Sequence, residues 1–114
     1  MHETHRPPEY AAVRHILAAP ALARRTAPYV HEDDFDWSGI YVEAKTMSGG
    51  ERLLIDLAAE LWSAEKMTGL WEVPRRLDPH NFRRVIEALY LCRGAPVAPP
   101  AAVLAAERLE GLAA

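Results

Sequence analysis

The chain has 114 residues, of which 50% are hydrophobic and 25% are charged, a composition typical of one globular domain and not of a disordered chain. The net charge of −3 excludes the overall basic character that favours nucleic acid or anionic membranes. The single cysteine, Cys92, excludes an intrachain disulfide, and no apolar run approaches the roughly 20 residues that span a bilayer. We therefore expect a cytoplasmic protein that does not enter membranes.

The first predicted element is a helix over residues 9–19, with Pro8 in its first turn. Its larger apolar residues recur at helical spacing: Val13, Ile16 and Leu17. Pro20 is expected to end this helix, and residues 21–26 predict one further turn.

Residues 29–37 (YVHEDDFDW) contain four acids, one histidine and three aromatics, and predict a loop with aromatic anchors. Residues 39–45 (GIYVEAK) fit two structures. Their β-branched and aromatic residues favour a short strand at 40–44, but the same residues would suit one face of a helix. We favour the helix, because the chain offers no second strong strand for pairing.

The clearest element is a helix over residues 49–67. Ser48 is a good N-cap, and Glu51 three residues later completes a capping box. The polar positions form one narrow stripe: Arg52, Asp56, Glu60 and Ser63. Because a helix that is apolar over most of its circumference must be surrounded by others, we place it at the centre of the domain.

The start of this helix has a second interpretation. Residues 47–61 (MSGGERLLIDLAAEL) resemble the signature motif of ABC-type ATPases, especially of the chromosome-maintenance branch. The resemblance implies an anion contact at Ser48, Gly49 and Gly50, where free backbone N–H groups would face a phosphate. The chain contains no GxxxxGK[ST] phosphate loop and no apolar strand ending in Asp-Glu after the helix. We therefore interpret the segment as a capped helix start and predict no cofactor.

A connector follows at residues 68–77, in which Gly69 is expected to close the central helix. Its apolar residues are expected to fill the edge of the core: Leu70, Trp71 and Val73. Trp71 would be a natural interface anchor if it were exposed instead.

The last strong element is a helix capped by Asp78, with Pro79 at its first position and Gly94 as its stop. Five residues predict its apolar face: Phe82, Val85, Ile86, Leu89 and Cys92. Three charged residues are expected on the opposite face: Arg83, Arg84 and Glu87.

Together these elements predict an all-α fold, a small bundle of four or five helices around the helix at 49–67. We divide the chain into a loose tail (1–7), a helical domain (8–94), a Pro-rich linker (95–100) and a C-terminal segment (101–114). The last of these predicts a helix over 101–112. Its apolar face is thin, with Leu104 and Leu112 prominent, so it needs another surface for stability.

Enzymatic chemistry has no positive support in the sequence. Cys92 lies on an apolar helix face, where a thiol is normally inert, and no GxSxG motif is present. The acidic stretch around His31 could attract a divalent ion but lacks the glycine and bidentate acid of a calcium loop. We predict no metal site, and we rank a cryptic enzyme third among the possible functions.

A nucleic-acid interface is the second hypothesis. Four arginines cluster around the start of the Asp78 helix: Arg75, Arg76, Arg83 and Arg84. The helix order loosely resembles a helix-turn-helix regulator, but the connector exceeds the usual turn of about 3–4 residues.

The leading hypothesis is a small non-enzymatic interaction domain, acting as an adaptor, assembly factor or regulator. It would bind a protein partner or itself through Trp71, Leu104 and Leu112, and we expect a homo-oligomer. Its size also suits an accessory protein of a phage or mobile element. Neither the partner, the oligomer number nor the biological process follows from these residues.

Overall fold

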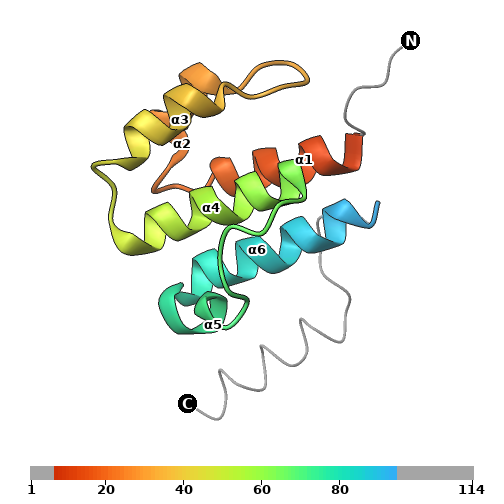
Figure 1. Cartoon of the computed structure of the whole chain (residues 1–114). Coiled ribbons are helices and arrows are strands. Elements are labelled where there is room, and N and C mark those ends of the chain that lie inside the picture. Colours follow the sequence, from red (N-terminus) through yellow and green to blue (C-terminus); the bar gives the residue numbers. More distant parts are fainter. Residues whose placement is uncertain (1–6, 95–114) are drawn as a thin grey trace.

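The computed structural model describes residues 7–94 and shows an all-α fold (Figure 1). Its elements are α1 (Pro7–Leu17), α2 (Ala23–Thr26), a 3-10 turn η1 (Ala27–Tyr29), α3 (Trp37–Ala44), α4 (Gly49–Ser63), α5 (Glu72–Arg76) and α6 (Pro79–Cys92). The predicted fold class is confirmed. Residues 40–44 are helical, and within residues 7–94 the only β pairing is an isolated bridge between Val30 and Phe35. Residues 1–6 of the expected tail at 1–7, the linker at 95–100 and the C-terminal helix lie outside the described residues, and Pro7 belongs to α1 instead of the tail.

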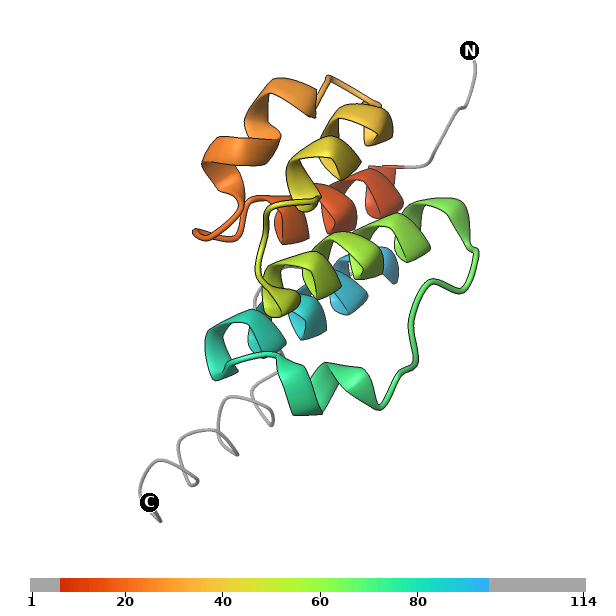
Figure 2. The ribbon, with the colours of Figure 1, turned by 60° about the vertical axis from the view of Figure 1, so that its left-hand side comes forward.

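Three helices form the body of the domain. α1 packs against α4 on one side and α6 on the other, while α3 packs on α4 and α2 packs on α3 (Figures 1 and 2). The first helix starts two residues before the predicted Glu9 and ends at Leu17. Its apolar residues are almost completely buried, namely Ala12, Val13, Ile16 and Leu17. α4 in turn packs on α1, α3 and α5, as expected for a helix that is apolar around most of its circumference.

The α2–α3 layer is closed by aromatic packing. Phe35 is buried, with its ring 5.0 Å from that of Tyr10 and 4.9 Å from that of Trp62. The acidic loop before α3 therefore carries an aromatic anchor, as the sequence predicts. Two acids of this loop accept hydrogen bonds from backbone N–H groups. Asp34 accepts from the N–H of Phe35, and Asp36 caps α3 by accepting from the N–H of Gly39.

The capping box at the start of α4 is confirmed. The Ser48 hydroxyl accepts from the N–H of Glu51 at 3.2 Å, and the Glu51 carboxylate accepts from the N–H of Ser48 at 2.9 Å. The predicted end of this helix is wrong. It ends at Ser63, four residues before Met67, and Ala64 instead of Gly69 takes the left-handed conformation, with φ of 64°.

Two polar side chains account for this early end. The Ser63 hydroxyl donates to the carbonyl of Ala59 and accepts from the N–H of Glu65. It thereby satisfies a backbone N–H that a longer helix would have paired. The Glu60 carboxylate accepts from the N–H of Met67 at 3.2 Å. Two residues of the predicted polar stripe, Glu60 and Ser63, thus end α4 and stabilise the backbone that follows it.

α6 begins and ends as predicted. Asp78 accepts from the N–H of Asn81 at 2.8 Å, Pro79 is the first helical residue, and Gly94 has a positive φ of 81°. The connector before it is not entirely irregular, because residues 72–76 form the short helix α5. This element has only five residues and Pro74 at its centre, which is why periodicity does not reveal it.

Candidate functional site

The orientation of α6 on α1 creates the most distinctive surface of the domain. Glu87 and Arg84 were expected on the solvent face, but both meet α1. The Glu87 carboxylate lies 2.6 Å from Nε2 of His15, and Arg84 donates to the His15 carbonyl at 2.8 Å. Ala88 is fully buried in the same contact. This pairing orients the predicted apolar face of α6 partly away from α1.

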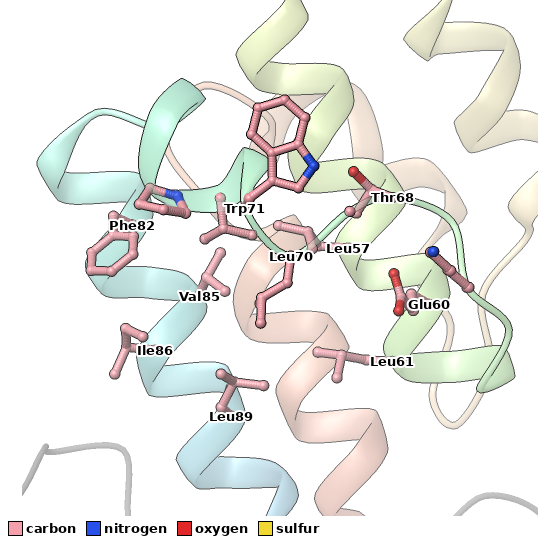
Figure 3. Close-up of a pocket in the computed structure, with 14 residues that line it drawn as sticks. Leu57, Glu60, Leu61, Thr68, Leu70, Trp71, Phe82, Val85, Ile86 and Leu89 are labelled. Carbon is pink, nitrogen blue, oxygen red and sulfur yellow. The ribbon is translucent and has the colours of Figure 1, made fainter.

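The exposed part of that face forms one wall of an open groove. Phe82, Val85, Ile86 and Leu89 line the groove from α6, and they follow the i, i+3, i+4, i+7 spacing of one helical stripe. Leu57 and Leu61 of α4 line the opposite wall, and Leu70 and Trp71 of the connector lie over one end (Figure 3). The volume of this α4–α6 groove is about 1080 Å³.

Large apolar side chains are concentrated at this groove. Within residues 7–94, six large hydrophobic residues are exposed, and four of them line it: Leu70 (83% exposed), Trp71 (58%), Leu89 (45%) and Phe82 (37%). The other two are Met67, in the same connector, and Val42, on α3. An apolar cluster of this kind on a small domain marks an interaction surface, whereas single exposed hydrophobics are ordinary.

Trp71 is held in place although it is exposed. Its indole nitrogen would lie only 2.9 Å from a Cβ atom added at Gly69, so the ring packs directly over the glycine backbone. On the ring, the Arg75 guanidinium carbon lies 4.6 Å from the ring centroid. The expectation that Leu70, Trp71 and Val73 all fill the core edge is therefore correct only for Val73. Trp71 is instead exposed, and its ring is held in one position by Gly69 and Arg75.

The groove has few polar lining residues. Glu60, Lys66 and Thr68 line it, and the carboxylate of Glu60 is already engaged by the N–H of Met67. The remaining lining is almost entirely apolar. Such a surface is suited to covering another apolar surface, because proton transfer or group transfer would need convergent polar side chains.

The four arginines of the nucleic-acid hypothesis do not form a common surface patch of unengaged cations. Each has a partner within the protein. Arg75 lies over the Trp71 ring, and Arg84 donates to the His15 carbonyl. Arg76 pairs with the Glu72 carboxylate at 3.7 Å, and Arg83 pairs with the Glu87 carboxylate at 3.5 Å. α4 and α6 each pack mainly on α1, with α5 between them in the chain. This arrangement does not favour DNA docking by a helix-turn-helix in preference to binding of a partner in the groove.

The Ser-Gly-Gly turn is occupied by the protein's own side chains. Ser48 and Glu51 cap each other's backbone, and an Arg76 guanidinium nitrogen would lie 2.6 Å from a Cβ atom at Gly49. The end of the flexible Arg76 side chain therefore lies directly against the Gly49 backbone. Gly50 meets only the Arg76 carbonyl at an ordinary distance. The turn works here as a capped helix start beneath an arginine.

The remaining candidates for chemistry are dispersed. The part of the chain from 7 to 94 contains no group of three or more side chains arranged to hold a metal ion. Burial raises the pKa of the Cys92 thiol, and the nearby Glu9 carboxylate raises it further, so the reactive thiolate is disfavoured. None of the helices described here has the length and apolarity required to cross a bilayer.

Sequence reasoning placed most groove residues in the core. Leu57, Leu61, Phe82 and Leu89 all belong to predicted apolar faces, and nothing local distinguishes a face that meets another helix from one that does not. Trp71 was predicted as a partner contact and does lie in the groove, whereas Leu104 and Leu112 fall outside the described residues. Comparison with protein-family models, curated proteins and solved structures finds no match.

Proposed function

We propose that this protein is a small interaction domain that binds an amphipathic helix of a partner protein in the α4–α6 groove. The observation that carries the proposal is the clustering of four exposed large hydrophobic residues along one groove: Leu70, Trp71, Phe82 and Leu89. An adaptor, assembly factor or regulator acts by such docking, without chemistry of its own.

The shape of the groove favours a helix as the ligand. Its main walls are the helices α4 and α6, and α1 passes behind them (Figure 3). A helix placed between such walls presents its own i, i+3, i+4, i+7 stripe to the matching stripe of α6. Trp71 stands at the end of the groove as a rigid anchor, and anchors of this type dominate the energetics of interfaces. Lys66 and Arg75 at the margin favour acidic residues beside the partner's apolar stripe.

A groove variant and a matched control test the proposal. Leu89→Asp places a charge in the groove, and Val42→Asp places the same charge at an exposed hydrophobic on α3, outside it. Proximity labelling with the full chain in its native cells is expected to identify partners that Leu89→Asp loses and Val42→Asp retains. Trp71→Ala is expected to weaken binding of such a partner by about tenfold or more.

The contradicting result is a set of labelled proteins that is the same for the wild type, Leu89→Asp and Val42→Asp. Because Leu89 is 45% exposed, the charge should leave the helical circular dichroism signal unchanged, and this verifies that a lost partner does not reflect unfolding. Self-association is a separate outcome: light scattering would then show an oligomer that Leu89→Asp dissociates and Val42→Asp does not.

A further inference from the structure

We propose that residues 101–112 of the same chain occupy the α4–α6 groove at rest, so that a partner helix must displace them. The inference rests on the groove being a helix-docking site, as proposed above, and it adds the regulation of that site. It makes the domain autoinhibited, with its own C-terminal segment as the competitor.

The chain after α6 is long enough to return to the groove. α6 ends at Cys92 and Gly94 turns the backbone, five residues beyond Leu89 in the groove wall. Returning to the level of Leu89 takes about 7.5 Å along the helix axis, and the neighbouring helix position lies about 8–10 Å to the side. The six residues 95–100, three of which are proline, reach about 19 Å when extended. The linker therefore spans the turn without strain.

The pattern of the segment matches the groove. Leu104 and Leu112 are eight residues apart and would lie on one face of a helix, with Leu109 next to Leu112. Four of the twelve residues are alanine, all close to Leu104, and their small side chains permit a close approach to α4 and α6 at that end: Ala101, Ala102, Ala105 and Ala106. A helix of 12 residues is about 18 Å long, and the stripe from Phe82 to Leu89 covers about 10 Å of that length.

The electrostatics and the energetics point the same way. The segment carries two acids, Glu107 and Glu110, and one base, Arg108. The groove margin carries Lys66 and Arg75 against the lining acid Glu60, whose carboxylate is engaged by the N–H of Met67. A helix this short is marginal alone in water, and the groove exposes apolar side chains to the same water. Because the two are covalently linked, the effective concentration of the segment at the groove is about millimolar, so even a weak contact is populated.

The test uses Trp71 of the full chain as a reporter. Leu112→Asp should release the segment, and Val103→Asp, which places the same charge on the opposite helix face, should not. The Trp71 contribution is isolated by subtracting the spectrum of the same protein carrying Trp71→Phe. We expect Leu112→Asp to shift the Trp71 emission to longer wavelength and to raise its quenching by acrylamide, with no change for Val103→Asp. Equal Trp71 accessibility in the wild type and Leu112→Asp would overturn the inference.

Light scattering separates the intramolecular contact from an exchange between copies. A monomeric wild type supports docking within one chain. A dimer that Leu112→Asp dissociates would show that the segment reaches a second copy, and this would overturn the inference.

The two proposals fail in distinguishable ways. If Trp71 responds to Leu112→Asp but this released variant labels no protein that Leu89→Asp loses, the covered groove is structural and the docking function fails. If groove-dependent partners appear while Trp71 does not respond, the function stands and the autoinhibition fails.

Discussion

Two sides of the same helical body differ in how far their apolar residues are covered. On one side, α3 packs on α4 and α2 packs on α3, and Phe35 and Ile40 are buried there. On the other side, α4 and α6 also present apolar residues, but within residues 7–94 only the connector and the short α5 lie over them, and Leu70 and Trp71 remain exposed. We call these the closed side and the groove side.

The difference lies in what covers the apolar faces and not in their composition. The closed side is made tight by local devices: Asp36 caps α3, Gly39 admits the Tyr29 ring, and Arg25 donates to the side chain and carbonyl of Glu43. On the groove side, the contact with Gly69 instead holds Trp71 in an exposed position. One side therefore stabilises the fold, and the other keeps an apolar surface exposed, which in our proposal receives a second helix.

The largest expected effect comes from comparing a fully buried leucine with an exposed leucine of the groove side. Leu54→Ala removes a fully buried side chain and should lower the free energy of unfolding by about 2–5 kcal/mol. Leu70→Ala removes a side chain that is 83% exposed and should change it by less than about 0.5 kcal/mol. Urea unfolding of the full chain measures both. Similar losses would mean that the groove side belongs to the core.

A smaller effect is expected from adding a methyl group. A Cβ atom at Gly39 would overlap the Tyr29 ring, so Gly39→Ala should destabilise the closed side by about 1–3 kcal/mol even though alanine favours helices. Gly50→Ala is the control, because its Cβ would meet only the Arg76 carbonyl at 3.6 Å, and it should be neutral or stabilising. Thermal unfolding compares them, and a stable Gly39→Ala variant would show that α3 is packed loosely.

The smallest effect concerns a carboxylate on α4. Burial raises the pKa of Asp56 above its ordinary 3.8, and the Arg52 and Arg76 guanidinium groups lower it only in part. The pKa of the Tyr41 hydroxyl is also raised, first by burial and then by the nearby Asp56 carboxylate. Because folding favours protonated Asp56, its contribution to stability is complete below pH 3.8 and is lost as pH rises through the folded-state pKa. Above that pKa, Asp56→Asn should therefore be more stable than the wild type.

This gain should disappear in acid. Urea unfolding across the acidic range is expected to bring Asp56→Asn and the wild type together below about pH 3.8. Asp33→Asn, in the exposed loop before α3, removes the same charge and provides the control. A gain that persists at low pH would assign the effect to packing instead of ionisation.

The sequence by itself determined the elements whose signals are local. The all-α class, the capping box of Ser48 and Glu51, and the Asp78-Pro79 start and Gly94 stop of α6 all follow from short-range hydrogen bonding and backbone preference. The helical state of residues 39–45 also follows, since no strand was available for pairing. The end of α4 was missed because the side chains of Ser63 and Glu60 bind backbone groups beyond the helix.

Only the tertiary structure decided which apolar faces are covered. The contact between His15 and Glu87 joins residues 72 positions apart and sets the orientation of α6, so that Phe82 and Leu89 face a groove and not the core. A periodic pattern reports that a helix has an apolar face, but the burial of that face depends on a neighbour elsewhere in the chain. Trp71 shows the same limit: its type marks it as an anchor or a core residue, and only the position of Gly69 and Arg75 beside it makes it an exposed anchor.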